Sequence, residues 1–367
     1  SVQSASGAGR FRPPTLRPWR RSAAAVPPAA EMPSALLLLA AAQGASLHRP
    51  TSSAATLRTF ETRWPAFVSR VEDRVLGHPV VRSNKYTQWF AKGEATDAEA
   101  RDLVIQFSVF SNLFLEAQLA KVINAGSLEE MREGKEILAN EIGVVFNHNG
   151  RSKTPVAAVR GHVAAPGEAI DPELVALEGS VEGGVFHFKA GHYEWLLDIG
   201  ESLGVGFHAM GTRRHGCSST LHFCDALKAL YGSPDPETAL AASFAVENWA
   251  AAGFWDELVT GWKAFNAKRP RGQRVPVGFW THHAALEAQH AGHTMDELRE
   301  VYCAGRVTDE DGFLDHCDEI LDAIGVFWDG LDARRRGVPV PKPSMDYLAM
   351  AHATLPGGAE PPLGGGA

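Results

Sequence analysis

Beyond Arg58 the apolar residues recur at intervals of three and four positions, which is the period of a helix buried along one side. Thr96 with Glu99, and Ser127 with Glu130, have the spacing of capping boxes. Each pair stands directly before a run with this period. The pattern therefore predicts a helix start at each of these two points.

A third helix start is indicated by Asp235 followed by Pro236, because proline is favoured at the first helical position. This helix is predicted to continue to about Phe265. Further helices are predicted at roughly 60–76, 189–204, 217–231, 277–291, 295–304 and 309–335. No two-residue hairpin signal with alternating flanks occurs in the chain. We therefore predict a single all-α domain.

Two stretches interrupt the helical period. Residues 149–186 are rich in Gly, Pro and Ala, and the end of the chain after Val338 is of low complexity. The expected organisation is a disordered leader or targeting segment at 1–58, a helical domain at 59–337 and a disordered tail at 338–367. Residues 149–186 are expected to form a long loop inserted into the helical domain.

The first residues have a composition of their own. Residues 1–31 hold five arginines and a single acid, Glu31. From Met32 a short apolar core at 35–42 is followed by small residues and by a basic, hydroxyl-rich stretch up to Arg58. This order is typical of a two-part address to plastids in algae with secondary plastids. A plain secretory signal or an uncleaved tail is the alternative.

Composition and charge exclude several classes of function. The formal net charge is −8, with 35 basic and 43 acidic residues, so no polybasic footprint for nucleic acid is present. No apolar run approaches the roughly 20 residues of a membrane span, and we expect no membrane partner. The four cysteines form no CxxC pair, which favours a reducing compartment for the folded part.

Histidines are concentrated in the stretch THHAALEAQHAGH at 281–293. On a helix His283, Glu287 and His290 fall within about 60° of arc, and therefore point the same way. His282 and His293 are predicted to aim elsewhere. A single histidine here would more often be a core-edge residue, but three convergent side chains indicate a metal site. Mixed nitrogen and oxygen donors suit zinc, iron or manganese better than magnesium or calcium.

Other helices must supply the remaining ligands of such a site. Glu247 lies in the apolar stretch AVENWAAAGFW, where an unpaired carboxylate would be costly to bury. The alternative is that Glu247 faces solvent. His192 shares a helical face with Trp195 and other apolar residues, and Glu141 is a lone acid in LANEIGVVF.

Together these residues resemble the haem-oxygenase-like dinuclear iron oxidases and oxygenases. That family is related in fold to haem oxygenase, the thiaminase-II-like proteins and the pyrroloquinoline quinone synthase. Its pattern is a Glu and a His from one region, a Glu from a middle helix, and His-x3-Asp/Glu-x2-His from a late helix. The resemblance spans about residues 60–335 and implies a seven-helix bundle. It implies as metal ligands Glu141, His192, Glu247, His283, Glu287 and His290.

Two departures from the family pattern leave alternatives open. Glu141 precedes His192 by 51 residues, whereas relatives separate the two by ten or fewer. Glu182, ten residues before His192, is therefore a rival first carboxylate, and the pair Glu141 and His148 is another arrangement. Relatives also often have Asp at the position of Glu287.

The resemblance implies two Fe(II) per chain and O2 as co-substrate, although a site that holds one iron at rest is also considered. The expected activity is that of an oxidase or oxygenase on a small carboxylic or amino acid, by oxidative C–C cleavage, decarboxylation or hydroxylation. The fold alone does not name the substrate. Expected partners are the small-molecule substrate and an external electron donor, and a homodimer is also considered.

The rival functions come from four other classes of protein. A ferritin-like carboxylate protein needs a second Glu-x2-His besides Glu287 and His290, and the sequence holds none. A thiaminase-II-like hydrolase would use Cys217 or Cys224 as nucleophile. A haem protein would need one axial His and would leave the carboxylates without a role. A non-catalytic helical binding protein is the remaining alternative.

Overall fold

A computed structural model describes residues 54–143, 191–290, 294–340, 345 and 347, with the backbone alone described at 54–59, 129, 133, 140 and 286–290. Throughout these ranges the secondary structure is helical and contains no strand, which confirms the predicted all-α class. The predictions for the inserted loop with His148 and Glu182, for His293, and for most of the leader and tail fall outside the described residues. Residues 54–58, which were expected to belong to the disordered leader, lie in the first helix.

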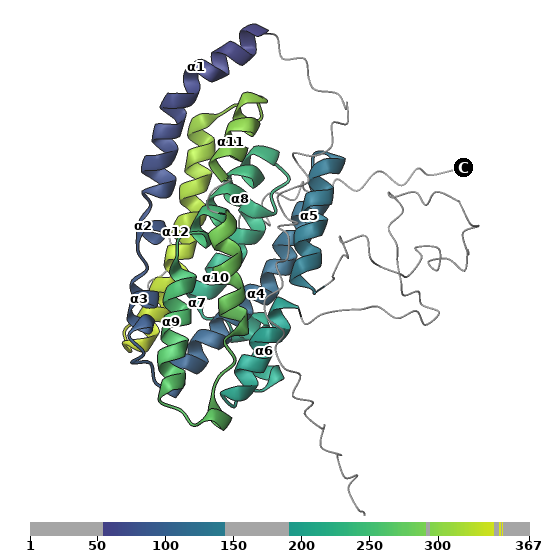
Figure 1. Ribbon diagram of the computed structural model, residues 1–367. Helices are drawn as coiled ribbons and strands as arrows, with labels where there is room; N and C mark the ends of the chain where they lie inside the picture. The colour runs from purple at the N-terminus through teal and green to yellow at the C-terminus, as the bar shows by residue number, and fades with distance from the viewer. Residues whose placement is uncertain (1–53, 144–190, 291–293, 341–344, 346, 348–367) are drawn as a thin grey trace, which may run out of the picture. The chain divides into compact units, whose positions relative to one another are not determined.

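Figure 1 shows the described helices in chain order, with residues 144–190 between α5 and α6 outside the description. A π-helical segment, Glu72–Leu76, follows α1, and another, Leu227–Tyr231, follows α7. The helices are α1 (Ala54–Val71), α2 (Pro79–Arg82), α3 (Lys85–Ala91), α4 (Asp97–Ile123), α5 (Leu128–Glu141), α6 (His192–Ser202), α7 (Ser218–Ala226), α8 (Pro236–Ala250), α9 (Phe254–Ala267), α10 (Gly278–His290), α11 (Thr294–Cys303) and α12 (Glu310–Arg335).

The predicted helix starts are present. Thr96 and Glu99 form a complete capping box at the start of α4, with the Glu99 backbone N–H donating to Thr96 Oγ1. At α5, the Glu130 backbone N–H donates to Ser127 Oγ over 3.1 Å. Asp235 caps α8 by accepting from the Thr238 backbone N–H at 2.8 Å. Local hydrogen bonding therefore explains why these three helices begin where the sequence indicates.

The single helix predicted from Pro236 to Phe265 is wrong, because the chain forms two helices there. α8 ends at Ala250 and α9 begins at Phe254, and Gly253 between them has φ +84°. This left-handed conformation stops an α-helix and is tolerated best by glycine. α2 and α3 were not predicted, because four and seven residues are too short to show a helical period.

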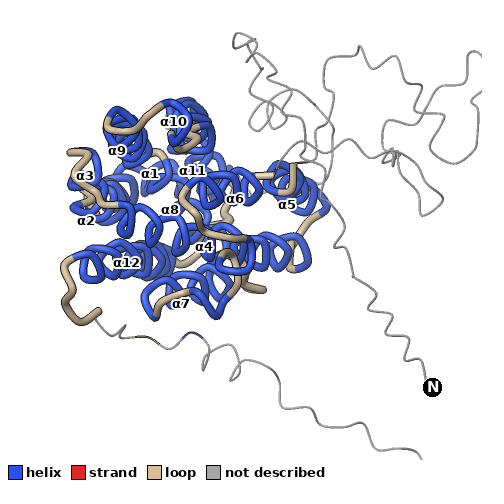
Figure 2. Tube along the Cα trace, turned by 90° about the horizontal axis from the view of Figure 1, so that it is seen from below, coloured by secondary structure: helices blue, strands red, loops and turns tan. Residues whose placement is uncertain are grey.

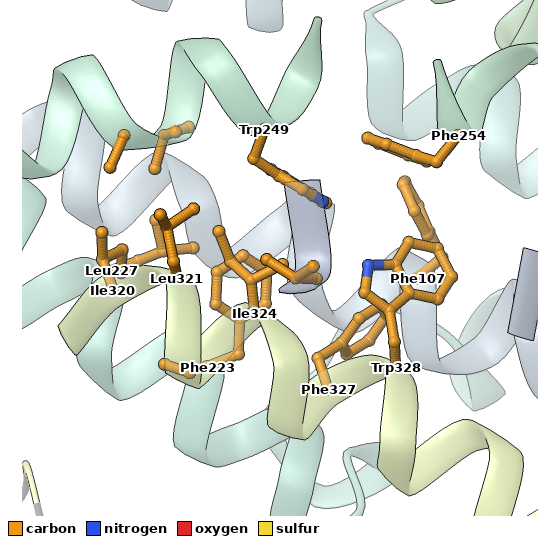
Figure 3. Packing of buried hydrophobic residues seen from close by; sticks show 14 of the residues in the cluster. Phe107, Phe223, Leu227, Trp249, Phe254, Ile320, Leu321, Ile324, Phe327 and Trp328 are labelled. Carbon is orange, nitrogen blue, oxygen red and sulfur yellow. The ribbon is translucent and has the colours of Figure 1, made fainter. Parts of the chain in front are cut away.

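Large aromatic side chains fill the space around α12 (Figure 3). Phe223 from α7 and Phe327 from α12 lie with their ring centroids 5.7 Å apart. Trp328 of α12 meets Phe254 of α9, which stacks on Trp249 of α8. We call these five residues the aromatic core. Figure 2 shows α12 and α7 along one side and α9 with α10 along the other, with α8 between them.

One described helix, α4, is long and apolar enough to cross a membrane by length and composition, with a mean hydropathy of 1.4 in its most apolar window. Half of that window is buried inside the protein, as is usual for the core helix of a globular fold. α4 also packs against α5, α6 and α7. The helix is therefore accounted for by its place in the core.

Candidate metal centre

The described part of the histidine-rich stretch, up to His290, lies in α10, as the sequence predicts. His283, Glu287 and His290 all belong to its continuous Gly278–His290 span, so their Cα atoms share one face. The side chain of His283 is buried, with 8% of its surface exposed. The side chains of Glu287 and His290 lie outside the description. Their part in a metal site stays a prediction.

Glu141 and His192 meet although 51 residues separate them in sequence. Glu141 is the last residue of α5 and His192 is the first of α6. His192 Nδ1 lies 3.0 Å from Glu141 Oε2, and both side chains are largely buried. The carboxylate accepts, so His192 Nδ1 carries a proton and Nε2 is the ring nitrogen left for another partner.

Gly191 makes this junction possible. A Cβ atom at Gly191 would lie 2.8 Å from the Glu141 carbonyl oxygen, which is too close for any side chain. The Gly191 backbone N–H also donates to Glu194 Oε2 at 3.0 Å, which caps the start of α6. The absence of a side chain therefore allows the two helix ends to approach until Glu141 reaches His192.

His283 completes a cluster of three residues with Glu141 and His192, which we call the carboxylate–histidine cluster. The rings of His192 and His283 lie with their centroids 4.7 Å apart. His283 Nδ1 donates to the Phe279 carbonyl oxygen at 2.8 Å, so Nε2 holds the lone pair. Burial, and then the neighbouring His192, lower the pKa of His283 to about 3. His283 is therefore neutral at physiological pH.

Aromatic side chains enclose His283. The ring of Trp255 stacks on it, with the centroids 4.6 Å apart and the planes 20° apart. Phe279, one turn earlier on α10, lies 4.3 Å from the His283 ring. Both aromatic residues are almost fully buried. They keep water away from the imidazole, which is the physical cause of its lowered pKa.

His282, predicted to aim away from the face of His283, is exposed, but it has neighbours on α6 that the sequence analysis did not include. Its ring lies 5.8 Å from that of His192 and 5.2 Å from that of Trp195, centroid to centroid. Burial and the neighbouring His192 lower the pKa of His282. The angle between side chains around α10 does not include the neighbouring helix, and α6 packs against α10 beside His282. The pair of adjacent histidines was the available signal in the sequence.

Glu247 lies near the end of α8, where it is half-buried and has an interaction partner. Its neighbour Asn248 accepts at Oδ1 from Thr294 Oγ1, at 3.3 Å, where α11 follows α10. The end of α8 is therefore held beside the start of α11. The contacts seen directly in the candidate site are those of His192 with Glu141 and with His283.

The donor set fits a transition metal in type, but the full site is not demonstrated. Among the described side chains, no group of three or more His, Cys, Asp or Glu is placed to hold a metal ion. Glu141 is hydrogen-bonded to His192 in this state and would have to turn to become a ligand itself. Imidazoles whose other nitrogen donates to a carboxylate or a backbone carbonyl are nonetheless the usual form of metal-binding histidines.

His192 and His283 both have this form, with Nδ1 hydrogen-bonded and Nε2 left for a metal ion. Their Nδ1 partners, Glu141 and the Phe279 carbonyl, would orient them toward a metal ion. Comparison with known proteins adds no identification, because no protein-family model and no curated protein matches this chain.

Proposed function

We propose that this chain is an iron-dependent, O2-activating oxidase or oxygenase with a haem-oxygenase-like bundle, acting on a small carboxylic or amino acid. The observation that carries the proposal is the meeting of Glu141, His192 and His283 from three separate helices. One buried histidine is often only a core residue. Two adjacent imidazoles beside a carboxylate, each with a hydrogen bond at Nδ1, are a more specific arrangement.

Nitrogen and oxygen donors in this ratio favour iron, manganese or zinc, and iron alone among these three commonly activates dioxygen in such sites. When bound, iron would supply electrons to dioxygen one at a time. In the proposal the iron ligands are Glu141, His192, Glu247, His283, Glu287 and His290.

The surrounding residues have roles of their own. The Phe279 carbonyl holds His283 in one tautomer, which makes its Nε2 more basic. Trp255 and Phe279 exclude water from the same ring. A water-poor site strengthens the charge interactions inside it and protects reactive species from side reactions. These features agree with oxygen chemistry and also with metal binding alone, so activity must be measured.

The first test is an anaerobic titration of the full chain with ferrous iron. Wild-type protein is expected to bind two irons per chain, and His283→Ala and Glu141→Ala are each expected to weaken binding by at least about tenfold. His316→Ala is the matched control, because His316 pairs with Glu319 on the surface of α12. The proposal is contradicted if the wild-type chain binds no iron, either with or without added fatty and amino acids.

Oxygen consumption gives the second test. Iron-loaded protein is mixed with oxygenated buffer and a panel of fatty and amino acids, and the oxygen uptake is recorded. Uptake that depends on one of these acids supports the oxygenase. Iron and acid binding without any uptake would instead identify a non-catalytic helical binding protein.

The described contacts of Cys217 and Cys224 do not support the alternative of a thiaminase-II-like hydrolase. Cys224 is buried, and burial raises the pKa of its thiol to about 12, so it is a poor nucleophile at neutral pH. Cys217 Sγ lies near Ser219 Oγ at 3.2 Å and Thr220 Oγ1 at 3.3 Å. Hydroxyl groups of this kind do not deprotonate a thiol, so the described hydrogen bonds of Cys217 Sγ include no activating base of the sort that such a hydrolase requires.

A further inference from the structure

A second polar cluster lies one helical turn from Glu247. Lys121 of α4 donates from Nζ to Ser243 Oγ of α8 at 2.7 Å, and its Nζ lies 3.4 Å from the Tyr231 hydroxyl. The ammonium group also stands 4.4 Å from the centroid of the Tyr231 ring. Gln118, one turn before Lys121, donates from Nε2 to the same hydroxyl at 3.2 Å. We call these four residues the lysine cluster.

The lysine cluster and the proposed metal centre share α8. Ser243 and Glu247 are four residues apart on this helix, so they lie on the same face about one turn from each other. The ammonium group of Lys121 donates a hydrogen bond to Ser243. A small molecule with one end bound at Lys121 would therefore extend to the region of Glu247.

Hydrogen-bonding capacity in the lysine cluster is not used up. The Lys121 ammonium has three N–H donors and two hydroxyl acceptors near it. The Tyr231 hydroxyl accepts from Lys121 and from Gln118, which leaves its own proton as a further donor. Gln118 is fully buried, and its Oε1 has no partner among the described residues. The spare donors on Lys121 and Tyr231 are the openings that suit an anion, whereas Gln118 Oε1 is an acceptor and does not.

The charge of the cluster indicates what fills it. Among the described side chains, no carboxylate forms an ion pair with Lys121, although other half-buried cations of this protein, such as Arg74 and Arg335, each have one. A half-buried ammonium without a counter-charge is poised for an anion. Its spare donors, one on Lys121 and one on Tyr231, match the two oxygens of a carboxylate, whereas a phosphate would use more.

We propose that Lys121, assisted by Tyr231, binds the carboxylate of the substrate. This inference rests on the proposed function and narrows it, because it selects acids over neutral molecules and sets their carboxylate on the α4 side of Glu247. Lys121 is a binding residue in this proposal and takes no part in holding iron.

The test measures ligand binding to the iron-free full chain by calorimetry. The probes are acetate, decanoate and L-phenylalanine, with decanamide and L-phenylalaninamide as counterparts that lack the carboxylate. At least one acid is expected to bind wild-type protein more tightly than its amide. Lys121→Met is expected to weaken the binding of that acid by roughly ten- to a hundredfold, and Tyr231→Phe is expected to weaken it by less.

Lys228→Met is the matched control. Lys228 lies three residues before Tyr231 but is exposed and paired with Glu116 over 2.7 Å. Its removal is expected to leave acid binding unchanged. Circular dichroism checks that each variant is folded, and Tyr231→Phe remains as a test should Lys121→Met fail to fold.

The outcomes separate the inference from the proposed function. Equal acid affinity in wild-type and folded Lys121→Met protein, or no acid binding to the wild-type chain, overturns the inference while the iron titration stands by itself. Acid binding that depends on Lys121 in a chain that binds no iron overturns the proposed function and leaves a carboxylate-binding site.

Discussion

The aromatic core and the carboxylate–histidine cluster are both buried, but their contacts differ in kind. In the aromatic core the rings of Phe327, Trp328 and their neighbours meet each other, and the indole N–H groups of Trp249 and Trp328 have no hydrogen-bond partner among the described residues. In the cluster, His192 and His283 each have a hydrogen bond at Nδ1.

The difference shows what each region is for. The area of the large rings buried in the aromatic core stabilises the fold enough to outweigh the unpaired N–H groups. The cluster buries imidazoles and a carboxylate, whose desolvation opposes folding, and apolar residues of the same size would pack there at lower cost. Stability explains the first region but not the second, so we attribute the cluster to function.

The largest effect is expected from removing a ring of the aromatic core. Phe327 is fully buried and contacts Phe107, Phe110 and Phe223. Phe327→Ala should lower the free energy of unfolding by about 3–5 kcal/mol, through lost burial and the cavity that remains. Urea denaturation measures this change. A loss below about 1 kcal/mol would show that neighbouring helices collapse into the space.

The carboxylate–histidine cluster should make the stability of the fold depend on pH, whereas the aromatic core holds no group that titrates. In metal-free protein the folded pKa of His283, about 3, is below its ordinary 6.5, so protons bind the unfolded chain more tightly. Stability is therefore expected to fall as the pH drops from about 6.5 toward 3. His283→Phe keeps a ring between Trp255 and Phe279 and should reduce this loss, as measured by urea midpoints at pH 7 and pH 4.5.

His316 provides a control of opposite sign. Its hydrogen bond to Glu319 raises the pKa of His316, so its contribution is fully present below pH 6.5 and is lost as the pH rises through the raised value. His316→Gln should therefore reduce stability slightly at acid pH and leave it unchanged at alkaline pH. An equal acid loss in wild-type and His283→Phe proteins would contradict the assignment to His283.

The same contrast explains which features the sequence could predict. Helix starts such as Thr96 and Asp235 depend on residues within one turn, and these predictions are confirmed. The meeting of Glu141 with His192 depends on how α5 and α6 pack, which their 51-residue separation does not reveal. Their choice as a pair came from the resemblance to a family, and the structure places them in contact.

The helical period misses two features of the structure, the break at Gly253 and the neighbours of His282. The helical period runs through Gly253 because apolar residues continue on both sides, and only the observed φ of +84° shows the break. His282 points off the face of His283 on α10, but the position of α6 decides what it meets. A helical period reveals neither the backbone conformation of a single glycine nor the helix that packs alongside.

A smaller effect is expected at Gly253 itself. No atom lies within 4 Å of a Cβ placed there, so Gly253→Ala tests the backbone conformation alone. The left-handed conformation should make the variant less stable by about 1–2 kcal/mol. Gly325 within α12 also has open space and an ordinary helical φ, and Gly325→Ala should instead stabilise by about 0.5–1 kcal/mol. Two changes of the same sign in urea denaturation would contradict this explanation.

The smallest effect is expected at the exposed ion pair of Lys228 and Glu116, whose side chains are 57% and 51% exposed. Lys228→Met should change the free energy of unfolding by no more than about 0.5 kcal/mol, because such pairs are screened by water and salt. Lys121 differs because its ammonium is half-buried and its contacts are hydroxyl groups and a ring. If Lys121 serves a ligand, Lys121→Met should also cost little stability while it abolishes most acid binding. A large loss of stability in Lys121→Met, with acid binding retained, would make Lys121 a structural residue like those of the aromatic core.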